Sequence, residues 1–133
     1  MRETNFRAWD SLTNKMFPVE IIDYSVRSVY IGESNGLSGE RDFDDIELMQ
    51  FTGLKDKNGK EIFEGDIVRY KLGRNIFTEV VVYDKDSAGF GVVDNDVDGI
   101  IFSFGELWED IELHNLEIIG NKYENPELLG EGE

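Results

Sequence analysis

Short segments of alternating apolar and polar residues, separated by Gly, Asp and Asn, run along most of the chain. Residues 5–9 and 16–19 alternate on either side of the turn-rich stretch 10–14, which predicts a β-hairpin. Residues 21–26 and 28–31 continue the β-type composition. No stretch keeps apolar residues at helical spacing for three turns, so we expect a mostly β protein, in the β or α+β class, with little helix.

The middle of the chain carries a strand signal and a turn signal. Residues 46–52 alternate strictly, and we expect a strand there rather than a short helix at 43–49. The polar run 39–45 before it is expected to be mobile. Asn58-Gly59 lies between two extended arms and predicts a two-residue type I′ turn, in which both residues have positive φ.

Five further apolar segments follow after residue 63, joined by Gly, Asp, Asn and Lys. They lie at residues 64–70, 79–83, 89–93, 100–104 and 113–119. Short strands at this spacing are typical of a small closed barrel. Residues 80–82 are apolar on both faces, which indicates a central strand. Asn125-Pro126 predicts the N-cap and first position of a short helical turn.

The composition changes near residue 53, where an N-terminal β layer gives way to the barrel-like remainder. We therefore expect an N-terminal β subdomain at 1–53, a barrel at 54–124, and a C-terminal turn with an acidic tail at 125–133. Because 133 residues is the length of one domain, these parts are expected to pack as one compact unit.

The composition favours a folded chain and removes several kinds of active site. Hydrophobic residues make up 40% and aromatic residues 12% of the chain, which is too many for a disordered one. The absence of cysteine excludes disulfides, thiolate zinc sites and cysteine nucleophiles. The single histidine, His114, excludes a two-histidine metal site, and its strand-like surroundings favour a structural or surface role.

Neither a membrane span nor a signal peptide is indicated. No apolar run approaches about 18 residues, and the start of the chain carries charges where a signal peptide needs an apolar stretch. We therefore expect a cytoplasmic protein.

The net charge is −16, and the negative charge is concentrated toward the C-terminus. Residues 94–133 hold twelve of the 29 acids and one of the 13 bases, so this segment carries −11. Nucleic-acid binding needs clustered Lys and Arg, so we expect no direct binding to nucleic acid, although Lys55, Lys57 and Lys60 form a local basic group. We predict an acidic partner-binding face on the C-terminal strands and loops. Its residues would be Asp94, Asp96, Asp98, Glu109 and Asp110, together with Trp108.

Residues 94–99, with the sequence DNDVDG, open like the calcium loop of an EF-hand. The pattern then fails, because position twelve of such a loop needs a bidentate glutamate and falls on Gly105. We therefore interpret 94–99 as an acidic turn between strands, in which Asp94, Asp96 and Asp98 are the candidate metal ligands. Phe102 and Phe104 alternate onto one face and are predicted to pack in the core, and no catalytic or cofactor-binding residues are predicted.

Three separated segments resemble the YopX family of phage and prophage proteins. They are residues 6–10 (FRAWD), residues 48–68 (LMQFTGLKDKNGKEIFEGDIV) and residues 118–129 (IIGNKYENPELL). The resemblance implies a β-rich fold with an SH3-like barrel and a gene of a phage or prophage in a bacterial host, and it supplies no catalytic residues. Gly65-Asp66 also fits the tight entry into a first barrel strand, since glycine permits the turn and Asp66 can accept backbone N–H bonds.

These features favour a non-enzymatic module that binds a host or phage protein, with an acidic nucleic-acid mimic acting on a host factor as a special case. Two alternatives stay open at this point. One is a metal-dependent enzyme that uses Asp94, Asp96 and Asp98, and the other is a structural homo-oligomer joined through sheet edges. No cofactor is expected.

Overall fold

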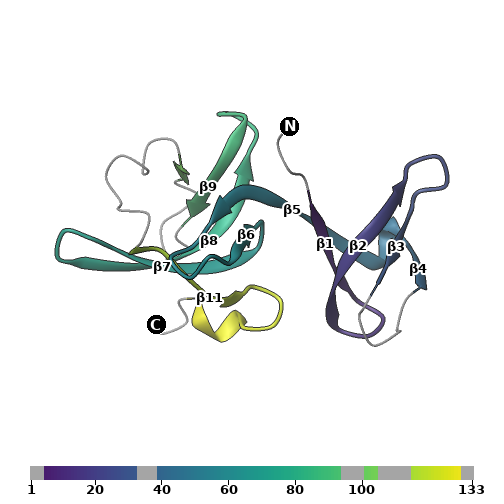
Figure 1. Ribbon diagram of the computed structural model, residues 1–133, viewed down its shortest axis with the longest axis horizontal. Helices are drawn as coiled ribbons and strands as arrows, with labels where there is room; N and C mark the ends of the chain where they lie inside the picture. Colours follow the sequence, from purple (N-terminus) through teal and green to yellow (C-terminus); the bar gives the residue numbers. More distant parts are fainter. Residues whose placement is uncertain (1–4, 33–38, 94–100, 105–114, 130–133) are drawn as a thin grey trace. The chain divides into compact units, whose positions relative to one another are not determined.

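The computed structural model describes residues 5–32, 39–93, 101–104 and 115–129 (Figure 1). Within these ranges the chain consists mainly of strands in two antiparallel sheets, with short 3-10 turns, so the expected mostly β fold is confirmed. The chain divides into two compact units, Met1–Phe51 and Thr52–Glu133, and each has its own hydrophobic core. No helix in the described ranges is long and apolar enough to cross a membrane.

The first unit is an antiparallel meander in the order β4-β3-β2-β1-β5. Its elements are β1 (Phe6–Asp10), β2 (Lys15–Asp23), β3 (Ser28–Ile31), β4 (Gly39–Asp42), the 3-10 turn η1 (Phe43–Asp45) and the start of β5 (Ile46–Lys55). β1 pairs with β2 around the turn at 10–14, as the alternation predicted. The prediction that 39–45 is mobile was wrong, because all four residues of β4 pair with β3 and η1 follows directly.

The strands of the first unit curl so that β4 returns to β1. Ala8, Phe17 and Val29 are buried on the inner face. In the sheet order β4 and β1 are three strands apart, which would be about 14 Å in a flat sheet. Arg41 Nε nevertheless lies 3.1 Å from Oδ1 of Asp10, whose side chain is fully buried. This ion pair closes the end of the curled sheet.

The second unit contains a five-stranded sheet in the order β10-β9-β8-β7-β11. Its elements are β6 (Glu61–Phe63), β7 (Asp66–Leu72), β8 (Asn75–Asp84), β9 (Gly89–Val93), β10 (Ile101–Ser103), β11 (Glu117–Asn121) and the 3-10 turn η3 (Pro126–Leu128). β6 lies beside β5 in the other sheet. Each of the five apolar segments predicted after residue 63 overlaps one strand of the five-stranded sheet. The arrangement is compatible with the expected SH3-like barrel.

The core of the second unit combines residues from most of its strands. Its buried members are Ile62, Val68, Tyr70, Val81, Val92, Phe104 and Leu116. β8 lies between β7 and β9 with Val80 and Val81 both buried, which confirms the predicted central strand. One carboxylate shares this interior: Glu79 is 2% exposed, and its Oε1 accepts a hydrogen bond from the Tyr70 hydroxyl at 2.6 Å.

The turn at 56–60 differs from the predicted type I′ turn. Gly59 has a φ of 82°, whereas Asn58 does not have a positive φ. The Gly59 N–H donates to the Asp56 carbonyl at 2.9 Å, and the Asp56 N–H donates to the Lys60 carbonyl at 2.9 Å. This pattern is a three-residue loop made of a type I turn and a glycine bulge. The prediction was wrong because the Asp56 side chain accepts the N–H groups of Asn58 and Lys60 and so stabilises the longer loop.

Three hairpins share a four-residue loop of one design, at residues 11–14, 24–27 and 85–88. An aspartate directly before each loop accepts hydrogen bonds from the loop: Asp10 from Leu12 and Thr13, Asp23 from Ser25, and Asp84 from Asp86 and Ser87. The last residue of each loop has a positive φ, at Asn14, Arg27 and Ala88. The side chain of the aspartate therefore orders the loop, and a left-handed residue returns the chain to the next strand.

The C-terminal turn forms at the predicted place with different bonding. Pro126 begins η3 and Asn125 precedes it, but the Asn125 side chain makes no capping bond. Asn125 therefore precedes the 3-10 turn as predicted but does not cap it. Its Oδ1 accepts the Asn121 N–H of the preceding turn at 3.1 Å instead.

Candidate functional site: an apolar patch on the β2–β3 hairpin

Asp56, in the middle of the longest segment of the family resemblance, is a structural carboxylate that is 6% exposed. Its Oδ1 accepts the N–H groups of Asn58 at 2.8 Å and Lys60 at 2.9 Å, and its Oδ2 accepts the Ile118 N–H at 3.0 Å. Burial alone would raise the pKa of Asp56, but the three backbone bonds and the Lys60 charge outweigh burial and lower the pKa below 3.8. Asp56 thus joins the 56–60 loop to β11.

Gly65 and Asp66 hold the entry into β7 as the sequence predicted. Gly65 has a φ of 87°, and Asp66 Oδ2 accepts the Phe63 N–H at 2.8 Å. Asp66 is 2% exposed, so its carboxylate lies inside the unit and not on a binding surface.

The C-terminal segment of the resemblance is also built around a turn. Asn121 Oδ1 accepts the N–H groups of Tyr123 at 3.0 Å and Glu124 at 2.9 Å. A Cβ at Gly120 would lie 2.5 Å from Asn125 Oδ1, so only glycine fits there without a shift. The segments that reveal the family therefore supply architecture, and a functional surface has to be sought among other residues.

Most residues that the sequence singled out for chemistry lie outside the described ranges. These are the metal candidates Asp94, Asp96 and Asp98, the other members of the predicted acidic face, Trp108, Glu109 and Asp110, and His114. Phe104 is 5% exposed and belongs to the core, as predicted, and the Phe102 side chain is not among those described. The acidic face and the candidate metal ligands therefore stay predictions.

The local basic group lies around the Asp56 loop. Lys55, Lys57 and Lys60 are all exposed. The Lys57 ammonium and the Arg69 guanidinium each lie 3.6 Å from the same Glu117 Oε1, which partly neutralises them. Pairs of this kind at a solvated surface contribute little to stability.

Exposed apolar side chains gather on the β2–β3 hairpin of the first unit. Eight large hydrophobic residues are exposed in the described part of the chain, and four of them lie between residues 21 and 30. We call these four the hairpin patch: Ile21 (55% exposed), Tyr24 (72%), Val26 (61%) and Tyr30 (41%). A concentration of this kind is more informative than single exposed hydrophobic residues, which are normal on any surface.

A β-bulge turns Ile21 outward. Val19 pairs with Ile31, but Ile21 pairs with Tyr30, so β2 has one more residue than β3 at this point. Val19 and Ile22 both pack on the inner core, whereas simple alternation from Val19 would have placed Ile21 there. The extra residue therefore places Ile21 on the outer face, directly beside Tyr30.

Tyr30 continues the outer row toward β4. Its neighbours Val29 and Ile31 are buried, and Tyr30 itself faces solvent opposite Glu40 of β4. Glu40 Oε2 accepts the Ser28 hydroxyl at 2.8 Å, and its Oε1 lies 3.5 Å from the Tyr30 hydroxyl. Glu40 thus places a hydrogen-bonded carboxylate beside the apolar pair.

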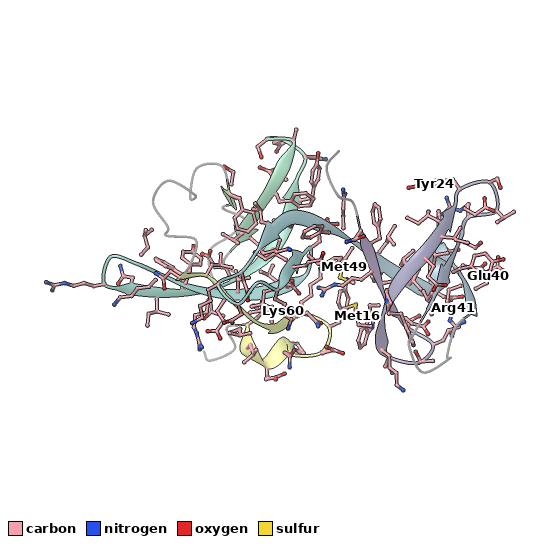
Figure 2. The ribbon with its side chains drawn as sticks, in the orientation of Figure 1. Met16, Tyr24, Glu40, Arg41, Met49 and Lys60 are labelled. Carbon is pink, nitrogen blue, oxygen red and sulfur yellow. The ribbon has the colours of Figure 1, made fainter. Side chains whose placement is uncertain are left out.

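Tyr24 and Val26 lie in the loop at the end of the hairpin. The Tyr24 ring contacts Phe43 edge to face, with centroids 5.8 Å apart, and the Arg27 guanidinium lies 5.2 Å from the centre of the Phe43 ring. Figure 2 shows Tyr24 at this loop and Glu40 and Arg41 on β4. Two hydrogen bonds from Ser25 lower the pKa of Asp23, which precedes the loop, so this carboxylate stays charged over most of the pH range.

Sequence reasoning missed the hairpin patch because Ile21, Tyr24, Val26 and Tyr30 read as ordinary strand residues. The bulge and the loop at 24–27 decide which of them face solvent, and neither leaves a clear signal in the order of apolar and polar residues. The signal available for the loop was an aspartate followed by a serine, and its spacing varies, since Ser25 comes two residues after Asp23 and Ser87 three residues after Asp84.

Comparisons with known proteins agree with the architecture. The family described as YopX protein matches residues 5–130. Protein EF1440 from Enterococcus faecalis has a similar solved structure, with 31% sequence identity and a TM-score of 0.60 over 97% of this chain and 99% of that one. Protein yopX from Bacillus subtilis has a TM-score of 0.62 and 23% identity over the same shares, which shows the fold alone. No curated protein matches the chain.

Proposed function

The chain belongs to the YopX family, and from this premise we propose that it is a non-enzymatic module of a phage or prophage that binds another protein in the cytoplasm of the bacterial host. The observation that carries the proposal is the hairpin patch. Ile21 and Tyr30 form an exposed cross-strand pair, and Tyr24 and Val26 extend the apolar surface to the loop. Tyrosine is enriched at the centres of protein interfaces, because its ring gives contact area and its hydroxyl gives a hydrogen bond.

The charges around the patch support a partner of particular chemistry. Asp23, Glu40 and Asp42 border it, and the base Arg27 also lies in this region. Interfaces combine an apolar centre with a polar rim of complementary charge. The partner is therefore a host or phage protein whose own apolar surface is bordered by Lys and Arg, and the net charge of −16 steers it toward the chain.

Capture from host lysate tests this proposal with a variant that changes only the patch. Ile21→Ser with Tyr30→Ser removes the exposed pair, and because both side chains face solvent the fold is retained. Ile76→Ser is the matched control, since Ile76 is 67% exposed in the second unit. We expect one set of proteins to be captured by the wild type and the control but not by the double variant, at low and at high salt. Equal capture by all three proteins contradicts the proposal.

The charge of residues 94–133 supports a narrower form of the same function. A segment of −11 can present carboxylates where a DNA-binding protein expects phosphates, as a nucleic-acid mimic does. Competition between the chain and duplex DNA for the captured host protein separates this form from an ordinary adaptor. A mimic displaces the DNA, and an adaptor leaves it bound.

A further inference from the structure

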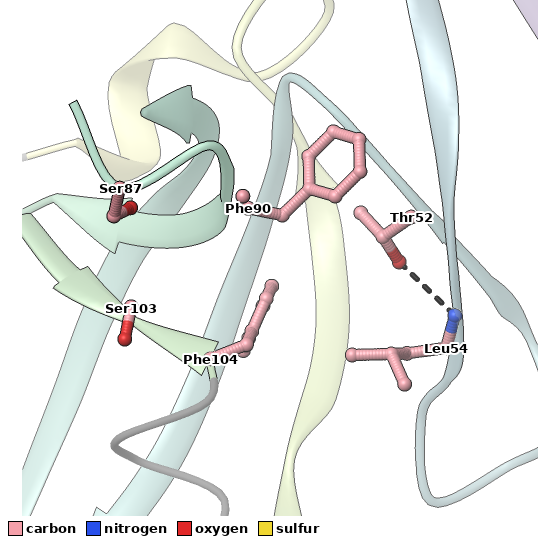
Figure 3. A pocket seen from close by; sticks show the side chains of 7 residues that line it. Thr52, Leu54, Ser87, Phe90, Ser103 and Phe104 are labelled. Carbon is pink, nitrogen blue, oxygen red and sulfur yellow. Dashed lines mark hydrogen bonds between the residues drawn. The ribbon is translucent and has the colours of Figure 1, made fainter. Parts of the chain in front are cut away.

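A pocket of about 330 Å³ opens on the second unit. Its lining residues come from β5, from β9 with the loop before it, and from the end of β10: Thr52, Leu54, Ser87, Gly89, Phe90, Ser103 and Phe104. Figure 3 shows Thr52 and Leu54 on one side, Ser87 and Ser103 on the other, and the two phenyl side chains between them. The pocket is therefore apolar at its centre and carries hydroxyl groups on both sides.

The hydroxyl groups of Thr52 and Ser87 each use their one O–H in a hydrogen bond to another atom of the protein. Thr52 Oγ1 donates to the Ile62 carbonyl at 2.8 Å and accepts the Leu54 N–H at 3.2 Å, and Ser87 Oγ donates to Asp84 Oδ2 at 2.9 Å. A hydroxyl oxygen has one proton and two lone pairs. Toward a ligand, each of these two oxygens can therefore act only as a hydrogen-bond acceptor, and a matching ligand has to supply an N–H or O–H donor.

The aromatic wall is held in place before any ligand arrives. Phe104 is 5% exposed and belongs to the core of the unit. The Phe90 ring meets the Tyr83 ring edge to face, with centroids 5.4 Å apart. A fixed aromatic wall favours a flat ring as the ligand, because stacked and edge contacts between rings need no rearrangement.

The size and charge of the pocket further restrict which ligands it can bind. Its volume is at the lower limit of the usual range for ligand pockets, so it holds one ring system and not a drug-sized molecule. None of the described residues that line it is charged, and the net charge of the chain is −16, so an anion is disfavoured.

We propose that this pocket binds a single indole or phenol ring, with its N–H or O–H donated to Ser87 Oγ or Thr52 Oγ1. The ring comes either from a free small molecule or from a Trp or Tyr side chain of a protein. The site goes beyond the proposed function, because it lies in the second unit and shares no residue with the hairpin patch.

Titration of the full chain, followed by amide chemical shifts in NMR spectra, tests the ligand chemistry. Indole is the probe, and 1-methylindole, which has the same ring but no donor, is the control. We expect indole to shift the amides of residues 52–54 and 87–90 with a dissociation constant on the order of millimolar, as befits so small a ligand. 1-Methylindole should bind at least fivefold more weakly. Equal shifts with both molecules, or shifts spread over both units, overturn the proposal.

Two variants locate the site independently of the probe. Ser87→Ala removes an acceptor, and Ser25→Ala is its matched control, since Ser25 donates to Asp23 in a loop of the same design at 2.6 Å. We expect Ser87→Ala to weaken indole binding by at least threefold and Ser25→Ala to leave it unchanged. Phe90→Ala removes one ring of the aromatic wall, and Phe90 is only partly buried, so the protein still folds. Undiminished binding to Phe90→Ala contradicts the assignment.

A third arm separates the two sources of the ring. N-acetyltryptophanamide carries the same indole on a peptide-like backbone. Binding at least as tight as that of indole identifies a protein side chain as the source, whereas loss of binding identifies a free small molecule. Neither result depends on the hairpin patch, so failure here and failure of the proposed function are distinguishable.

Discussion

Four buried acidic and amide side chains act as acceptors for N–H and O–H groups in turns. Asp10, Asp56, Asp66 and Asn121 are each buried and each order a turn in this way. The sequence suggested this role for Asp66, because Gly-Asp before an apolar run is a common strand entry. It did not suggest that Asp56 reaches β11, since the bond to Ile118 joins residues that are 62 positions apart.

Replacing Asp56 tests how much one such acceptor contributes. Asp56→Ala leaves the N–H groups of Asn58, Lys60 and Ile118 without their acceptor, and we expect a loss of about 3 kcal/mol in the free energy of unfolding. Urea unfolding of the full chain measures it. Asp86→Ala, at an exposed position, is the control and should change the free energy by less than about 0.5 kcal/mol. An equally small change in the free energy of unfolding for Asp56→Ala would contradict the structural role of the Asp56 carboxylate.

The carboxylates also predict how stability depends on pH. Burial raises the pKa of Asp10, but hydrogen bonds from Thr13, Arg41 and Leu12 outweigh it, so the pKa lies below 3.8 in the folded chain, as it does for Asp56. A lowered pKa stabilises the fold above the ordinary value, and this contribution disappears as the pH falls through the folded-state pKa. Stability should therefore drop below about pH 4.

Asp10→Asn isolates one part of that drop. The variant should be less stable than the wild type at neutral pH, because it weakens the bond to Arg41. Its stability should also fall less on acidification, so the two proteins converge at low pH. Urea midpoints measured across the acid range check this, and parallel curves for the two proteins would rule it out.

At the scale of elements, the order of apolar and polar residues predicted most strands but not which side chains face solvent. β1, β2, β5 and the five strands after residue 63 follow their alternation or apolar runs. β4 was missed because Gly39–Asp42 is polar and carries no alternation of apolar residues, although all four of its residues pair with β3. The outward position of Ile21 depends on a bulge, which one extra residue produces without any change in composition.

The positive φ at the end of the 85–88 loop predicts the effect of a glycine at position 88. This residue has a φ of 56°, which costs a residue with a Cβ about 1–2 kcal/mol. Ala88→Gly removes that cost and adds about 0.5–1 kcal/mol of unfolded-state entropy, so we expect a net gain of about 0.5–1 kcal/mol in stability. Lys85→Gly, in the same loop without a positive φ, should destabilise. Thermal melting compares them, and a loss in both variants would show that Ala88 is not strained.

At the scale of the whole molecule, the two hydrophobic cores share no residue within the described ranges. One includes residues of β1, β2, β3 and β5, and the other joins residues of β6 to β9 with Phe104 and Leu116. The sequence suggested a change in composition near residue 53. Which residues form each core could not be predicted from composition, because it depends on how the strands pair and curl.

Separate cores predict separate responses to a core mutation. Val29→Ala removes two methyl groups from a fully buried position and should cost the first unit about 2 kcal/mol. Hydrogen exchange resolved by residue should then show faster exchange in β1 to β3 and unchanged rates in β7 to β9. Equal acceleration in both units would show that they unfold together.

Position-specific photo-crosslinking tests most directly whether the hairpin patch contacts a protein partner. A photoreactive phenylalanine derivative is placed at Ile21 in one variant and at Ile76 in another, both exposed isoleucines on strands. After irradiation in host lysate, we predict a discrete protein adduct from position 21 and none of that mass from position 76. The same adduct from both positions, or an adduct from position 76 alone, would contradict the account.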